Sequence, residues 1–209
     1  MEWSEVLDPA LSPEELICEK VPRLHEARLE QFQRFSSATL IFSVEFTDTG
    51  DRFTFSLSPD GAEARTGEMI DFPQATARGA QSDWSRAVGL VATLVEPADQ
   101  QIERYEGKVH ITQDIVDGFE RFDGVLEVDV VDLPDGGPKL SFEVILNDYE
   151  EPPRAPRAHL TVPWQVLDEV AHGHLDPVAA AKGLRIRGSM GLALDLGGYF
   201  DQQLDLSRG

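Results

Sequence analysis

The sequence predicts an α/β protein, in the broad sense that includes α+β folds, with mostly antiparallel sheets covered by helices and two related halves. Three observations support this prediction. Apolar and polar side chains alternate, as in half-buried strands, over residues 40–46, 53–57, 125–132 and 140–146. A turn signal joins each pair of these segments, at residues 49–51 (TGD) and 134–137 (PDGG). Segments with helical spacing of apolar residues flank the strands.

Two helices are expected in the first half. One starts at residues 12–15 (SPEE), where a serine cap, a proline at the first helical position and a glutamate form a capping box. It is expected to run to about Phe35, bent or interrupted at Pro22. The other starts at Ser82 and is expected to stop before Pro97, because proline disfavours helical backbone in the residue that precedes it.

The remaining elements have weaker patterns. In the first half, strands are expected over residues 62–66, 74–79 and 108–112, followed by a helix over 114–122. In the second half, a proline-rich irregular crossing at 147–156 precedes a strand at 158–162, helices from Trp164 and from Asp176, a strand at 184–187 and a terminal helix at 189–200.

The order of elements suggests an internal duplication. Trp84 and Trp164 each open a helix, and each half ends in a helix that carries Phe-Asp, at 122–123 and 200–201. The halves are predicted at 12–122 and 114–201, with the helix at 114–122 shared between them. Residues 1–11 and 202–209 are expected to be terminal tails.

Composition argues against several classes of partner. Thirty-eight acidic and eighteen basic residues give a formal net charge of -20, which repels nucleic acid and anionic membrane surfaces. No apolar run reaches the roughly 20 residues that span a bilayer, and the acidic N-terminus lacks the features of a signal peptide. A cytoplasmic protein without stable membrane insertion is expected, with Cys18 as a small core residue.

The segment 162–196 resembles the end of the sterol carrier protein 2 (SCP2) family. The resemblance is carried by AHLTVPW at 158–164, VAHG at 170–173, LDP at 175–177, KGLRIRG at 182–188 and SMGLALDL at 189–196. It implies an α/β domain in tandem, whose mostly antiparallel sheet is covered by helices, with an apolar tunnel between sheet and helices. Such a tunnel accepts sterols, fatty acids or acyl-CoA esters.

The terminal helix supplies the first candidates for the wall of such a tunnel, because Met190, Ala193, Leu194 and Gly197 share one face. The opposite wall is expected from Trp164 and Leu167, together with Phe142 and Val144 of the preceding strand. The alternative is that this stripe of methionine, leucine and alanine is ordinary protein core. These residues nevertheless favour non-catalytic binding or transfer of a lipid-like apolar ligand.

Motifs for other chemistry are weak. His172 and His174 lie near Asp168 and Asp176, but a closed zinc site needs four ligands, so no metal is expected. The sequence contains no nucleophile motif and no glycine-rich phosphate loop, so neither catalysis nor a cofactor is predicted. Two alternatives stay open: a protein-interaction or homodimerisation module that has lost the tunnel, and an enzyme that uses His172, His174 or Asp176.

Overall fold

Eight strands form one continuous mixed sheet in the computed structural model, which describes residues 3–69 and 71–204. The strands are β1 (Leu40–Phe46), β2 (Arg52–Ser58), β3 (Gly61–Thr66), β4 (Ala75–Gly79), β5 (Gly124–Val131), β6 (Leu140–Leu146), β7 (Arg157–Pro163) and β8 (Arg185–Gly188). Their order across the sheet is β3-β2-β1-β4-β6-β5-β7-β8. The β1–β4 and β5–β7 pairs are parallel, and the other neighbours are antiparallel. The expected separate sheets are therefore joined into a single one.

The same connectivity occurs in both halves of the sheet. A hairpin, β1–β2 or β5–β6, is followed by a crossover to a strand parallel to the first strand of that hairpin, β4 or β7. Antiparallel pairing of β4 with β6 joins the two sets at the centre. The chain thus forms its sheet from two similar arrangements placed side by side.

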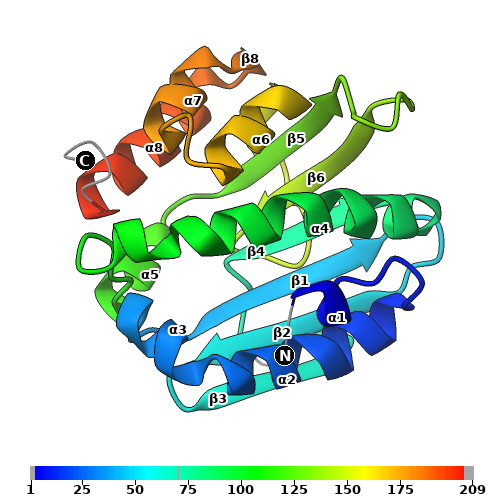
Figure 1. Cartoon of the computed structure of the whole chain (residues 1–209). Helices are drawn as coiled ribbons and strands as arrows, with labels where there is room; N and C mark the ends of the chain where they lie inside the picture. The colour runs from blue at the N-terminus through cyan, green and yellow to red at the C-terminus, as the bar shows by residue number, and fades with distance from the viewer. Residues whose placement is uncertain (1–2, 70, 205–209) are drawn as a thin grey trace.

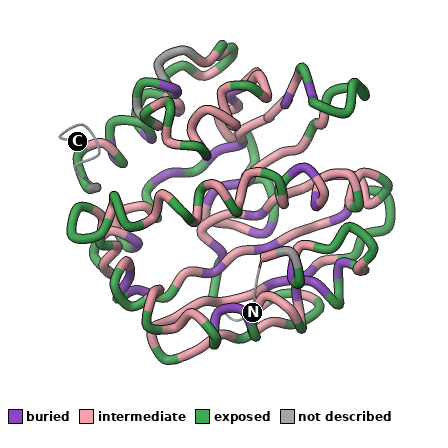
Figure 2. Tube along the Cα trace, in the orientation of Figure 1, coloured by how far each residue is buried: buried purple, intermediate pink, exposed green. Residues whose placement is uncertain are grey.

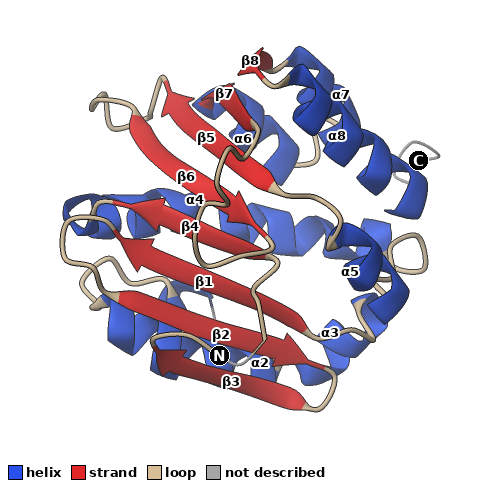
Figure 3. Ribbon diagram, turned by 180° about the vertical axis from the view of Figure 1, so that it is seen from behind, coloured by secondary structure: helices blue, strands red, loops and turns tan. Residues whose placement is uncertain are grey.

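Helices cover one face of the sheet and leave much of the other face to the strands (Figures 1 and 3). The α-helices are α1 (Trp3–Val6), α2 (Val21–Ala27), α3 (Leu29–Phe35), α4 (Trp84–Gln101), α5 (Gln113–Phe119), α6 (Trp164–Ala171), α7 (Pro177–Gly183) and α8 (Met190–Leu204). A π-helical segment, Glu15–Lys20, precedes α2, and short 3-10 turns, Gln81–Asp83 and Ile102–Tyr105, flank α4. None of the helices described in residues 3–69 and 71–204 combines the length and apolar character needed to cross a bilayer.

The core lies between the sheet and the helices, and buried positions follow the strands and the helix sides that face them (Figure 2). One cluster joins Ile17 to Phe46, Phe53 and Val88. A second cluster contains Leu90 and Val130, and a third lies under α8. Because Val88 and Leu90 both belong to α4, this helix packs against both halves of the sheet.

The capping box at the start of the first helix is confirmed. The Ser12 backbone N–H donates to Glu15 Oε2 at 3.0 Å, and the Glu15 backbone N–H donates to Ser12 Oγ at 3.2 Å. The helix that follows is divided into three pieces, with a break at Arg28. Residues 1–11, expected as a tail, contain α1, and the side chain of Val6 is fully buried.

Two sequence predictions are wrong for reasons of tertiary packing. The helix from Ser82 does not stop before Pro97, because α4 continues to Gln101. An ion pair of 2.6 Å joins the half-buried side chains of Arg28 and Asp99, which belongs to the turn after the proline. Residues 108–112 form no strand, only a bridge between Ile111 and Ser36. This segment cannot pair with β4 as a further strand, since β4 already pairs with β1 on one side and β6 on the other.

Candidate functional site

Helix α8 is apolar on two sides. Leu192, Leu196 and Tyr199 recur with helical spacing and are buried against Phe122 and Ala158. Other large apolar side chains of the same helix remain accessible to solvent: Met190 is 49% exposed, Leu194 64% and Phe200 37%. Within the described chain, the other exposed large apolar residues are Phe72 and Val91. Exposed apolar side chains therefore gather on this helix.

The second apolar side of α8, which carries Met190, Ala193, Leu194 and Gly197, forms one wall of an open groove of about 1060 Å³. Leu184 and Ile186, at the start of β8, form another wall, and Leu126 and Leu160 reach it from β5 and β7. The strand register explains this gathering, because Leu126, Leu160 and Ile186 all point to the helical face of adjacent strands. Helix α7 contributes Pro177 and Ala181. The groove is thus lined mainly by aliphatic carbon.

The structure brings together four of the eight predicted site residues. Met190, Ala193, Leu194 and Gly197 all line the groove. The wall expected opposite them is different, because Leu126, Leu160, Leu184 and Ile186 take that place. Their sequence signal was the alternation of apolar residues in β5, β7 and β8, which does not show that these strands are neighbours.

The other four predicted residues lie in the core. Phe142, Trp164 and Leu167 pack against the buried Leu90, Val130 and Leu133. Val144 packs against the cluster of Phe122 and Leu146. The reason is that α4, from the first half of the chain, covers α6 and β6, a long-range contact that local pattern does not reveal.

Two charged residues belong to the lining of the groove. Arg185 is exposed, and the alternation along β8 directs its side chain to the sheet face opposite Leu160 and Ile186. Asp201 lies near the C-terminal end of α8, and its buried Oδ1 has no hydrogen-bond partner within the described residues. The remainder of the lining offers few polar groups.

A second, more polar recess of about 690 Å³ lies on another side of α8 and shares Leu194 and Gly198 with the groove. Arg121 lines it, with its guanidinium carbon 4.8 Å from the centre of the Phe122 ring and 4.9 Å from that of Tyr199. The Tyr199 hydroxyl donates to the carbonyl oxygen of Ile115, and burial raises the pKa of this phenol. These contacts anchor α8 to α5.

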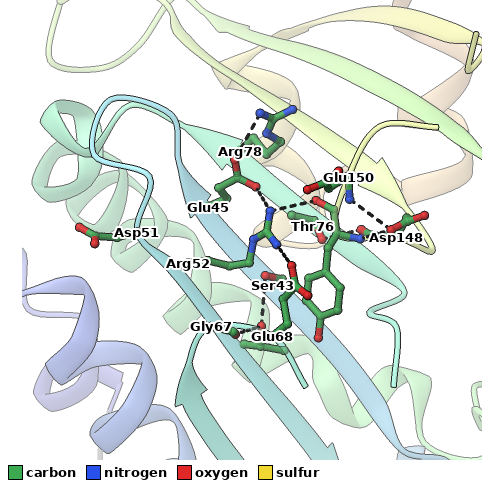
Figure 4. Close-up of polar contacts among 12 residues, drawn as sticks. Ser43, Glu45, Asp51, Arg52, Gly67, Glu68, Thr76, Arg78, Asp148 and Glu150 are labelled. Carbon is green, nitrogen blue, oxygen red and sulfur yellow. Dashed lines mark hydrogen bonds and ion pairs between the residues drawn. The ribbon is translucent and has the colours of Figure 1, made fainter. Parts of the chain in front are cut away.

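The sheet face away from the helices carries a network of alternating charges. Arg52 donates to Glu45 at 2.6 Å and also pairs with Glu68, and Arg78 Nη2 lies 3.2 Å from the other oxygen of Glu45 (Figure 4). Arg157 lies among Glu127, Glu143 and Glu151, whose hydrogen bonds and charges raise the pKa of its guanidinium. These ion pairs hold neighbouring strands together, although the buried Nε atoms of Arg52 and Arg78 have no hydrogen-bond partner among the described residues.

The histidine pair has contacts of a helix end. The rings of His172 and His174 stack with centroids 5.8 Å apart, and His172 Nδ1 lies 2.9 Å from the carbonyl oxygen of Asp168. Asp176 accepts a hydrogen bond of 3.0 Å from the Ala179 N–H and caps α7. Among the described residues, no three His, Cys, Asp or Glu side chains come together in a way that could hold a metal ion.

Compared with known proteins, the chain matches no family model and no curated protein.

Proposed function

We propose that this chain binds or transfers a lipid-like apolar ligand (a sterol, a fatty acid or an acyl-CoA) without catalysis, in the groove between α7, β8 and α8. The observation that carries the proposal is the second apolar side of α8, formed by Met190, Leu194 and Phe200. The first apolar side of α8 is buried in the core, and the second is exposed to water. Burial of this second side against another apolar partner is favourable, because it removes apolar surface from water. A ligand in the groove supplies it.

The size and chemistry of the groove support this proposal. Ligand sites in proteins are concave, mostly apolar and of about 300–1,000 Å³, and the groove has about 1060 Å³ with an aliphatic lining. The segment that resembles the SCP2 family, residues 162–196, provides the first half of α8 and all of β8 and α7. The repeated hairpin-and-crossover connectivity supports the two related halves that the proposal assumes.

The substitution Leu194→Glu tests the proposal. Leu194 is 64% exposed, so a charge there should hardly change stability, whereas in an occupied groove it would lie against the ligand. We expect half-saturation of the variant with a fluorescent fatty acid or sterol to require at least about tenfold more of that probe than the unsubstituted protein needs. The reason is that burial of a leucine contributes about 1.5–3 kcal/mol. The matched control is Val91→Glu, because Val91 is 45% exposed on α4 and does not line the groove. Equal binding by both variants would contradict the proposal.

Homodimerisation through the same surface is the second candidate function. It is favoured by the position of β8 at the edge of the sheet, beside the exposed apolar side of α8. However, antiparallel pairing of two β8 strands about Ile186 would place Arg185 of each copy opposite Arg187 of the other, and like charges directly opposite are destabilising. Light scattering of ligand-free protein decides: a concentration-dependent dimer abolished by Leu194→Glu would support this second function.

A further inference from the structure

Strand β8 carries two arginines on the uncovered face of the sheet, of which it is the last strand (Figure 3). Ile186 lines the groove on the helical side, so the alternation along the strand directs the side chains of Arg185 and Arg187 to the opposite face. Both arginines are exposed, and neither has an ion-pair partner among residues 3–69 and 71–204. This edge therefore presents uncompensated positive charge, although the protein has a formal net charge of -20.

The neighbouring strands do not offset this charge. The residues opposite the two arginines on β7 carry no carboxylate, and the carboxylates of Glu127 and Asp129 on β5 are already bound by other basic side chains. The edge strand at the other end of the sheet, β3, differs because its charged side chains, Glu63 and Arg65, pair with each other. Of the two edges of the described sheet, only that of β8 thus has two like charges without a partner.

The outer edge of β8 also has backbone groups that an added strand could use. The Ser189 N–H donates to the carbonyl oxygen of Arg157 at 2.8 Å. In an antiparallel ladder such bonds recur at every second pair, so the backbone groups of Arg187 and Arg185 point to β7 and those of Ile186 point outward. Within the described chain, no group hydrogen-bonds to this outward N–H or C=O. An edge of this kind is a template for pairing with another chain.

We propose that β8 binds an extended acidic segment of another protein, which joins the sheet as a further strand. Directly opposite residues of neighbouring strands share a face, so an acidic residue opposite Arg185 or Arg187 meets a guanidinium. The residue opposite Ile186 points to the helical face, beside the groove, and is apolar. The bound segment therefore alternates acidic and apolar residues. A second copy of β8 does not fit, because its arginines would face those of the first. This binding is independent of a ligand in the groove.

Fluorescence anisotropy with labelled peptides of about eight residues, an ordinary strand length, tests the proposal on the full-length protein. In the first peptide glutamate alternates with valine, and threonine or lysine replaces the glutamate in two controls. We expect the glutamate peptide to bind about fivefold more tightly than the threonine peptide, which is the range of two exposed ion pairs. The lysine peptide should bind more weakly still, although the net charge of the protein favours it. Equal affinities, or a preference for lysine, would overturn the proposal.

Methylation of the peptide backbone shows whether the bound peptide forms a strand. Successive N–H groups of a strand point to opposite edges, so only alternate N–H groups of the bound peptide face β8. We expect methylation of one set of nitrogens, those of valine or those of glutamate, to weaken binding at least about tenfold. Methylation of the other set should leave the affinity nearly unchanged. The same result for both methylated peptides would argue against an added strand, because attraction between charges does not distinguish them.

The combined substitutions Arg185→Glu and Arg187→Glu should invert the preference, so that the lysine peptide binds more tightly than the glutamate peptide. Such a gain of binding also shows that the variant is folded. The matched control combines Arg23→Glu with Arg65→Glu, which changes the net charge equally at two exposed arginines of α2 and β3. It should keep the preference of the unsubstituted protein, and an equal effect in both variants would overturn the proposal.

Light scattering tests the other occupant of this edge, a second copy of the chain. We expect the unsubstituted protein to bind the glutamate peptide as a monomer, with one peptide for each chain. A dimer in solution that does not bind the glutamate peptide would assign the edge to a second copy and overturn the proposal.

Discussion

Asp129, on the uncovered sheet face, has three side-chain donors or ring nitrogens around its carboxylate. Lys139 Nζ and Ser141 Oγ each donate to it at 2.6 Å, and His159 Nε2 lies 3.0 Å away. These hydrogen bonds, with that from Lys139 the largest, lower the pKa of Asp129 to about 2. Because the folded protein holds this carboxylate ionised more strongly than the unfolded chain does, Asp129 links stability to pH.

The sign of this linkage gives a prediction. The stabilisation by Asp129 is complete above the unfolded pKa near 4 and is lost as pH falls toward 2, so Asp129→Asn should cost on the order of 1–2 kcal/mol at pH 7. We expect the cost, measured by urea unfolding, to shrink between pH 4 and pH 2. Asp60→Asn in an exposed turn is the control and should show little change. A cost that does not vary with pH would contradict this role of Asp129.

Two glycines lie at the junction of β8 and α8, and only one of them needs to be glycine. Gly188 has a φ of +81°, and a Cβ at this position would lie 2.5 Å from the carbonyl oxygen of Arg157. Gly191, in the first turn of α8, faces open space. One glycine therefore permits β8 to pair closely with β7, and the other only weakens the helix.

Alanine substitutions should separate these two effects. We expect Gly188→Ala to destabilise the protein by at least about 2 kcal/mol, since left-handed backbone and a backbone clash both oppose a side chain. Gly191→Ala should stabilise it by about 0.5–1 kcal/mol through helix propensity. Urea unfolding at neutral pH measures both, and a destabilised Gly191→Ala variant would show that α8 is held by contacts absent from this structure.

The whole molecule is held together across its centre by β4, β6 and α4. Strands β4 and β6 pair with each other, while α4 places Val88 in the core of the first half and Leu90 in that of the second. An ion pair of 3.8 Å between Arg78 and Glu143 crosses the same seam. The two halves therefore share their packing, and neither has a complete core alone.

We expect the two halves to unfold in one cooperative transition. Trp84 reports on the first half and Trp164 on the second. In a Trp3→Phe background, two variants are made that each keep only one of these tryptophans. After correction for the effect of each substitution, both variants should give the same free energy of unfolding and the same denaturant midpoint. The two reporters should also agree with the loss of circular dichroism in each variant. A well-separated pair of transitions would show that the halves are independent domains.

Much of the secondary structure could be predicted because local patterns specify it. The alternation in β1, β2, β5 and β6 and the capping box at Ser12 depend on neighbouring residues, and the structure confirms them. The extension of α4 past Pro97 could not be predicted, because it depends on Arg28, which is distant in sequence. The same holds for Trp164, whose burial depends on α4.

The groove shows the same division. The chain alone indicated that Met190, Leu194 and Gly197 share a face of the last helix, since 3.6 residues per turn place them there. Only the tertiary structure placed Leu160 and Ile186 opposite them and left Met190 and Leu194 exposed. The physical reason is that periodicity determines which side chains point the same way along one element. What they face is decided by strand order and by the packing of helices that are far apart in sequence.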